Sequence, residues 1–233
     1  MSERVNTLNI GSRLILVGTV HVDPASASLV RETVRSTMPE VVALELDADR
    51  LRALQNPEAS RPGISSGLSF LFMALIEKFA GQLTGSSPGL EMVEAVKAAR
   101  TVGARVELID RPIRRTIEGI RKLPLREKLR LGADGVASLV LLPFGAVDVS
   151  NLTEDIDSQL TVFRSRYPRL SQILLDEREQ YMINRIKRIL DGTSGKVVGV
   201  VGFGHLSAVS RALEGYTERP GYSASLNWTL GVG

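Results

Sequence analysis

The chain has 233 residues, of which 43% are hydrophobic and 24% are charged, and its formal net charge is +3. This composition is typical of a globular protein, so we expect one domain with a sizeable core. The small charge, the 5% aromatic content and the lack of a dense basic run argue against nucleic acid as a partner. The absence of cysteine excludes disulfides and thiolate ligands, so any metal would be held by imidazole and oxygen.

The first residues, MSERVNTLNIGSRLILVG, carry polar side chains where a signal peptide needs an unbroken apolar stretch. We therefore expect no secretion signal and a location on the cytoplasmic side. The longest apolar segments, 68–81 and 135–149, are shorter than the ~20 residues of a membrane-spanning helix. Buried or interface helices are the expected alternative.

The chain alternates between short apolar runs and segments with helical periodicity. We predict strands at 14–17, 41–46, 105–109 and 197–201, because their apolar residues are continuous and β-branched, as in buried parallel strands. Helices are expected at 26–37, capped by Ser26, at 90–102, ending at Gly103, and at 169–190, ending at Gly192.

Residues 56–67 form a predicted loop, rich in Pro, Gly and Ser, which could be a lid but is better explained as a connector. Residues 112–166 are poor in strand signals and predict an inserted helical cap. The fold class is therefore α/β, with a mainly parallel sheet flanked by helices.

Polar residues follow all four predicted strands. In open parallel sheets, ligands bind outside the carboxyl ends of the strands, so these residues could converge on one crevice. In chain order they are Gly18, Thr19 and His21; Glu45 and Asp47; Asp110 and Arg111; and Gly202, Gly204 and His205.

The two histidines of the chain, His21 and His205, both end a G-x-x-H tetrad that follows an apolar run. We expect the glycines to adopt positive φ or to permit close approach, so that each imidazole reaches the sheet edge. A structural interpretation remains open: Glu45 and Asp110 could pair with Arg50 and Arg111 to hold loops, and Asp110 could cap a helix that begins near Pro112. The coincidence of four strand ends favours a site.

Two chemistries fit these residues. Two imidazoles and Glu45 could hold a divalent cation with an open water position. Alternatively, one histidine could act as a general base, with Glu45 fixing its tautomer. The chain has no Gly-x-Ser-x-Gly elbow and no P-loop, which argues against serine nucleophiles and nucleotide hydrolysis.

Two helical segments carry further candidates. Glu91 begins a predicted helix, where an acid can simply complement the dipole. In DEREQYM, residues 176–182, Glu177 shares a helix face with Tyr181, and Arg178 shares one with Met182. An ordinary solvated charge run explains Asp176 to Glu179 about as well.

The ordered segments GTVHVDPAS, PEVVALELDADR, LEMVEAVKAA, LIDRPI, DEREQYM and VVGVVGFGHLSAVSRAL resemble the TraB/PrgY family, which is related to the Tiki proteins. The resemblance implies a metal-dependent peptidase using Mn or Co, with the paired G-x-x-H motifs at its active site. It implies roles for His21, His205, Glu45 and Arg50, and it marks further family positions at Glu91, Asp110, Arg111, Glu177, Arg178 and Tyr181. PrgY and TraB are linked to the shutdown of peptide pheromone signalling, and a broader likeness to erythromycin-esterase folds implies the metal-free alternative.

Three features depart from the family pattern. Asp47 stands where a cysteine or small residue is expected, and Glu118 with Gly119 replaces a basic pair after Thr116. The chain ends at LNWTLGVG, where relatives often continue into membrane segments, so we expect membrane attachment only through a region outside this sequence.

The sequence thus predicts a metal-dependent peptidase or hydrolase. His21, His205, Glu45 and Asp110 are the candidate metal ligands, for Mn, Co or Zn. The catalytic candidates are Glu45, His21, His205, Arg50, Arg111, Glu177 and Tyr181, and the substrate-binding candidates are Arg50, Arg111, Arg178 and Glu91. The alternatives are a metal-free hydrolase with a histidine base and a protein that binds or sequesters a peptide without cleaving it. A homodimer is a further expectation.

Overall fold

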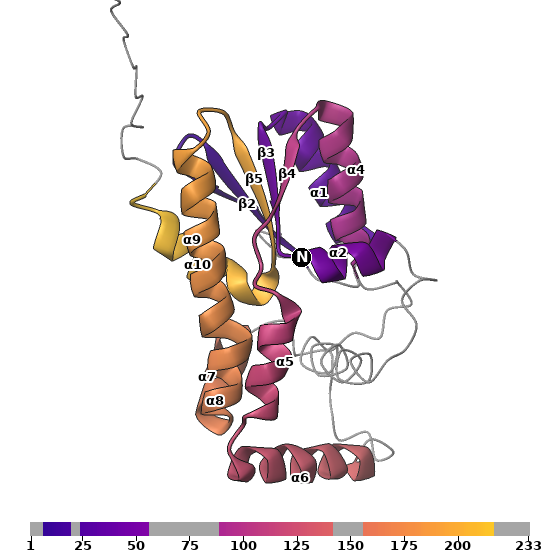
Figure 1. The fold of residues 1–233 in the computed structure, drawn as a ribbon, viewed down its shortest axis with the longest axis vertical. Coiled ribbons are helices and arrows are strands. Elements are labelled where there is room, and N and C mark those ends of the chain that lie inside the picture. Colours follow the sequence, from indigo (N-terminus) through magenta and orange to yellow (C-terminus); the bar gives the residue numbers. More distant parts are fainter. Residues whose placement is uncertain (1–6, 20–23, 56–88, 142–155, 217–233) are drawn as a thin grey trace, which may run out of the picture.

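A computed structural model describes residues 7–19, 24–55, 89–141 and 156–216 (Figure 1). Its centre is a five-stranded sheet of order β1-β2-β5-β3-β4. The strands β2 (Leu14–Thr19), β5 (Val197–Gly202), β3 (Val41–Leu44) and β4 (Arg105–Leu108) run parallel, and β1 (Thr7–Ile10) joins the edge antiparallel to β2. The α/β class and the mainly parallel sheet are confirmed. The edge strand β1 was not predicted.

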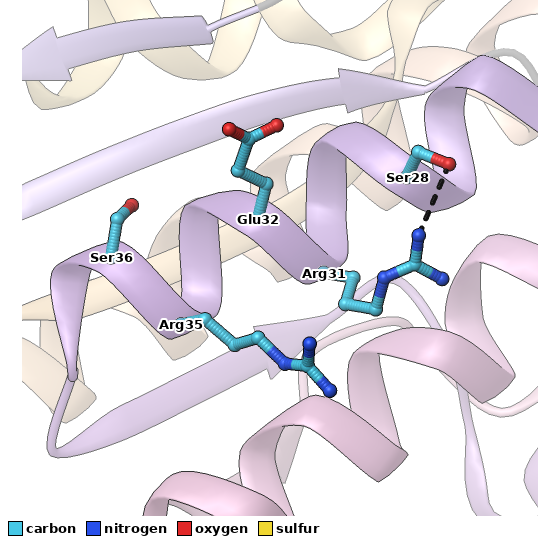
Figure 2. Close-up of a pocket in the computed structure, with 5 residues that line it drawn as sticks. All are labelled: Ser28, Arg31, Glu32, Arg35 and Ser36. Atoms are coloured by element: carbon cyan, nitrogen blue, oxygen red, sulfur yellow. Dashed lines mark hydrogen bonds between the residues drawn. The ribbon is translucent and has the colours of Figure 1, made fainter.

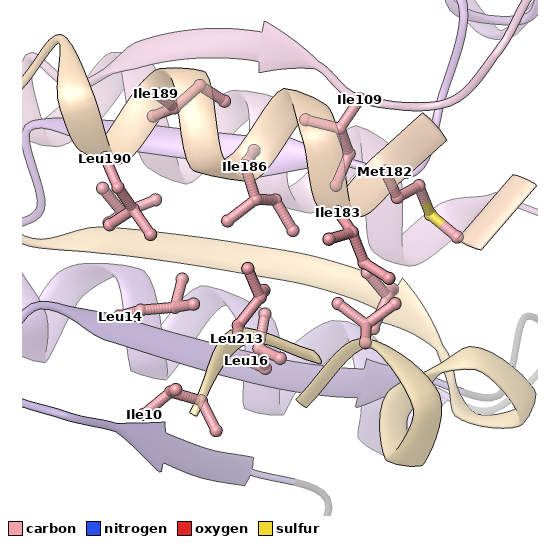
Figure 3. Packing of buried hydrophobic residues seen from close by; sticks show 14 of the residues in the cluster. Ile10, Leu14, Leu16, Ile109, Met182, Ile183, Ile186, Ile189, Leu190 and Leu213 are labelled. Carbon is pink, nitrogen blue, oxygen red and sulfur yellow. The ribbon is translucent and has the colours of Figure 1, made fainter. Parts of the chain in front are cut away.

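Helices cover both faces of the sheet. The helices α1 (Pro24–Thr37) and α4 (Leu90–Val102) pack together on one face, and α9 (Glu177–Asp191) and α10 (Phe203–Leu213) lie on the other (Figure 1). On the α9/α10 face, helix side chains such as Ile186 and Leu213 pack against Leu14 and Leu16 (Figure 3). The central strands are apolar on both faces, which is why their sequences are continuous rather than alternating.

Helix boundaries agree with the sequence prediction at some ends and differ at others. Helix α4 ends at Gly103, which has the expected left-handed conformation with φ of 73°. Helix α1 begins at Pro24, so the predicted N-cap Ser26 is wrong: it lies inside the first turn and is buried. Proline suits a first helical position because its missing N–H would have no helical partner there. A short helix, α2 (Ala48–Gln55), follows β3.

The described residues of the predicted cap are mostly helical. It contains α5 (Ile113–Arg121), α6 (Leu125–Leu141) and α7 (Ile156–Arg166). These helices lie beyond the carboxyl ends of the parallel strands (Figure 1). Ile120, Leu131 and Leu160, one from each of these helices, pack against a separate core. This core is built from Leu123, Phe163, Tyr167, Leu170, Ile173, Leu174 and Leu175, most of which follow α7 in the chain.

The predicted helix 169–190 contains a change of helical type. A short helix α8 (Pro168–Ser171) is followed by a π-helical turn, η4 (Gln172–Asp176), and then by α9. We expected one apolar stripe along its whole length. Instead, the buried residues before Asp176 belong to the cap core and those after Met182 belong to the core beneath the sheet.

The predicted loop 56–67 and the apolar segment 68–81 lie outside the described residues, as does most of 135–149. Within the described part of the chain, none of the helices combines the length and apolar character needed to cross a bilayer.

Candidate functional site

Seven side chains meet beside the carboxyl ends of β3, β4 and β5, and we call them the strand-end cluster. Four parts of the fold contribute them: the loops after the strands and the first turns of α2, α9 and α10. They are Glu45, Asp47, Arg50, Asp110, Arg178, Glu179 and His205. All are buried except Arg50, whose side chain is 27% exposed.

Glu45 lies one residue beyond β3 and joins two parts of the cluster. Its Oε1 accepts a short hydrogen bond from the Arg178 guanidinium, and its Oε2 accepts from the backbone N–H of Gly202 at 2.6 Å. Gly202 precedes the first turn of α10, so the carboxylate satisfies a free N–H at the positive end of that helix. This contact fixes Glu45 relative to the turn that carries His205.

Arg178 is the central cation of the cluster. Its Nη2 donates to Asp110 Oδ2 at 2.7 Å as well as to Glu45, and its Nε lies 3.1 Å from the same Asp110 oxygen. Burial alone would lower the pKa of Arg178, but the charges of Asp110 and Glu45 outweigh it and raise this pKa. Burial would likewise raise the pKa of Asp110, but Arg178 and Arg50 reverse that effect and hold the pKa far below its ordinary value. Both groups are therefore charged at neutral pH.

Asp47 positions the remaining cation. Its carboxylate accepts from the backbone N–H of Asp49 at 2.8 Å and from Arg50 Nε at 2.8 Å, as a residue that caps the start of α2 does. Arg50 then reaches Asp110 with a second, short contact. The unexpected acid at position 47 thus orients Arg50 and is not a simple surface charge.

His205 lies in the first turn of α10 between two carboxylates. Its Nδ1 is 3.1 Å from Glu179 Oε1, and its Nε2 is 3.6 Å from Glu45 Oε1. If Nδ1 carries the proton and donates to Glu179, the lone pair of Nε2 points toward Glu45. This tautomer suits either metal ligation or abstraction of a proton by Nε2.

Arg111 and Glu177 form a neighbouring pair at the junction with the cap. Arg111 donates to Glu177 at 2.5 Å, to Thr116 Oγ1 at 3.1 Å and to the Ile173 carbonyl at 2.7 Å. Its side chain is only 7% exposed. Three engaged donors on a buried guanidinium favour a positioning role over direct binding of substrate.

The structure does not place the other predicted site residues in the strand-end cluster. His21 lies outside the described residues, so its place relative to His205 stays a prediction. Glu91 is buried in the first turn of α4, and Tyr181 is half-buried on α9, one turn after Glu177. Their proposed roles in catalysis and substrate binding stay predictions.

The expectation of positive φ at the motif glycines is wrong for Gly202, which is extended at φ −60° and ψ 142°. Gly18 and Gly204 do not have positive φ either. Close approach explains Gly18: a Cβ there would lie 2.7 Å from the Leu206 side chain of α10. The first glycine therefore allows α10 to pack onto β2.

The donors for a divalent cation are only partly supplied by the described residues, which contain no group of three His, Asp or Glu side chains arranged to bind one. Two donors lie close enough: Nε2 of His205 is 3.6 Å from Oε1 of Glu45, although this oxygen also accepts from Arg178. Glu179 holds the other imidazole nitrogen, as a carboxylate commonly does behind a metal-bound histidine. Asp110 fits less well, because its oxygens accept from two arginines, Arg50 and Arg178, whereas those of Glu45 accept from one.

A surface pocket of about 470 Å³ lies elsewhere (Figure 2). It is lined by residues of α1 alone: Ser28, Arg31, Glu32, Arg35 and Ser36. None of them belongs to the strand-end cluster, so this pocket does not mark the candidate site.

Glu179 was not among the predicted site residues, although the motif that contains it was recognised. It precedes Met182 and Ile186 at helical spacing of three and seven residues, and both of those are buried. A carboxylate on the buried face of an amphipathic helix is the signal that could have identified it.

Comparisons with known proteins support the resemblance to the TraB/PrgY family. The model of the TraB/PrgY/gumN family matches residues 141–224, which include α9, β5 and α10. An uncharacterized protein of Methanocaldococcus jannaschii is 26% identical over 86% of this chain and 53% of its own length. TraB domain-containing proteins of Bos taurus and Homo sapiens are each 27% identical, over 86% of this chain and 62% of theirs. The chain thus spans between about half and three-fifths of the relatives it matches.

Proposed function

We propose that the chain, which is similar to the TraB/PrgY/gumN family over residues 141–224, is a metal-dependent hydrolase that cleaves a peptide at the strand-end cluster. The observation that carries the proposal is the pairing of His205 Nε2 with Glu45 Oε1, 3.6 Å apart, in a buried setting. Such a spacing lets two donors share one cation, and His21 is the proposed third donor.

The charge of the cluster also favours a bound cation. Glu45, Asp47, Asp110 and Glu179 carry four negative charges, whereas Arg50 and Arg178 carry two positive ones. The cluster therefore has a formal surplus of two negative charges when His205 is neutral. Arg164, from outside the cluster, pairs with Glu179 at 3.8 Å and reduces this surplus to one negative charge. Buried charge of one sign is costly, and a divalent ion would relieve it.

When bound, a divalent cation supplies Lewis-acid polarisation of a carbonyl and lowers the pKa of a bound water. The side chains of the chain perform the other tasks. Glu179 orients the imidazole of His205, and Arg178 holds Glu45 at the end of β3. Arg50, the most exposed cation of the cluster, is the guanidinium best placed to pair with a substrate carboxylate.

The proposal is tested by incubating the purified chain with a pool of synthetic peptides and following products by mass spectrometry. We expect cleavage that stops in EDTA and returns with added Mn²⁺. His205→Ala should reduce the rate by about 10²-fold or more, because a ligand or acid–base group is removed. Glu94→Gln is the control and should cleave at the wild-type rate, because Glu94 lies on α4, outside the cluster, and is paired with Lys97 and Arg31.

Two results would contradict the proposal in different ways. Cleavage that continues at full rate in EDTA would exclude the cation and leave His205 as a general base held by Glu179. Binding of peptide in a one-to-one complex, with no product after long incubation and no effect of Glu45→Gln, would instead identify a sequestering protein.

A further inference from the structure

The π-helical turn η4 lies at the junction between the two cores of the molecule. Before it, Leu170 and Ile173 pack in the cap core; after it, Met182 and Ile186 pack beneath the sheet. The backbone stays helical through the junction, with φ and ψ of −56° and −43° at Gln172 and −61° and −46° at Asp176. One continuous helix therefore serves both cores.

The wide turn changes the direction in which every later side chain points. The N–H of Glu177 donates to the carbonyl of Gln172, five residues back instead of four. One extra residue in a turn rotates the remainder of the helix by about 100° relative to an uninterrupted α-helix. The residues immediately after the turn, Glu177, Arg178 and Glu179, contact Arg111, Glu45 with Asp110, and His205 respectively.

Arginine side chains satisfy carbonyl groups of the wide turn. Arg111 donates to the Ile173 carbonyl at 2.7 Å, and Arg178 donates to the Leu174 carbonyl at 3.4 Å. Arg111 also contacts Glu177, the residue that follows the turn. The same guanidinium thus joins the start of α5, the wide turn and the first residue of α9.

We propose that the π-helical turn is a positioning device for the candidate site: it sets the helical register that places Glu179 against His205 and Arg178 against Glu45, and Arg111 is the residue that stabilises it. Its significance for catalysis rests on the proposed hydrolase function, but the geometry can be tested without any activity. π-Turns inside helices occur often at functional sites. Here the wide turn lets one helix pack in both cores and still make the three polar contacts of Glu177, Arg178 and Glu179.

Deletion of Gln172 tests the proposal, because it removes one residue from the turn and restores α-helical spacing. The measurement is the ¹⁵N chemical shift of the two His205 ring nitrogens, assigned by comparison with His205→Gln. We expect the deletion to move both shifts as far as Glu179→Gln does. Gln172→Ala keeps the chain length and should leave the shifts at their wild-type values. Wild-type shifts in the deletion variant would overturn the proposal.

Arg111→Met provides a second test that does not change the chain length and so covers the case in which the deletion fails to fold. It removes the donors to Ile173 and Glu177 and puts an unbranched, uncharged side chain in their place. We expect the His205 ring shifts to move in the same direction as in Glu179→Gln, and Arg111→Lys to restore part of the wild-type value. Unchanged shifts in Arg111→Met would show that Arg111 does not stabilise the turn. A failed hydrolase assay would not affect either outcome.

Discussion

Two arginine–aspartate networks in this molecule differ mainly in burial. In the cap, Asp134 on α6 accepts from Arg166 and from the Tyr167 hydroxyl, with side-chain exposures of 33% for Asp134 and 49% for Arg166. In the strand-end cluster, Arg178 and Asp110 are only 6% and 2% exposed. Water can replace either partner in the cap network, but it cannot easily reach those in the cluster. Folding therefore depends strongly on the pairs of the cluster and only weakly on those of the cap.

The largest difference in stability between the two networks should appear when the arginine of each is replaced. Arg178→Met leaves Glu45 and Asp110 buried without their main cation, so we expect a loss of about 3–5 kcal/mol in the free energy of unfolding. Arg166→Met removes an exposed partner, which water can replace, and should cost far less. Urea denaturation followed by circular dichroism measures both. Equal losses would show that burial does not distinguish the two networks.

Acid should lower the free energy of unfolding through both networks, with a smaller effect than the arginine substitutions. The folded pKa of Asp110 is depressed, so its stabilising contribution is complete above the unfolded value near 3.9 and is lost as the pH falls below it toward the folded value. Asp110→Asn should therefore flatten the decline in unfolding free energy below about pH 4. In the cap, hydrogen bonds from Arg166 and Tyr167 lower the pKa of Asp134 to about 2.

Salt distinguishes the two acids in this experiment. Because Asp134 is partly exposed, about 0.5 M NaCl should weaken the acid dependence that it contributes, whereas that of Asp110 should persist. The measurement is urea denaturation of wild type, Asp110→Asn and Asp134→Asn across pH 2–6 at low and high salt. An Asp110 contribution that salt screens as strongly as that of Asp134 would contradict the account.

The parallel strands could be predicted from sequence, because apolar runs such as Val41–Leu44 and Val197–Val201 are buried on both faces. The edge strand β1 could not, since its residues, TLNI, do not form a continuous apolar run and only Ile10 in it is buried. The convergence of Glu45, Asp110 and His205 followed from the rule that parallel strands end at one edge. The π-turn could not be foreseen: it depends on contacts such as that of Arg111 with Ile173, 62 residues apart. Glu179 could not be singled out, because it lies in a run of charged residues, 176–179, and such a run is typical of a solvent-exposed helix face.

The central claim, that His205 and Glu45 act on one centre, is tested most directly by a double-mutant cycle on the rate of peptide cleavage with Mn²⁺ present. The variants are His205→Ala, Glu45→Gln and the combination of both, each checked for folding by circular dichroism. Residues that serve one centre are strongly non-additive, so we predict that the double variant is about as slow as the slower single variant. Rate losses that multiply would show that the two residues act independently and would contradict the account.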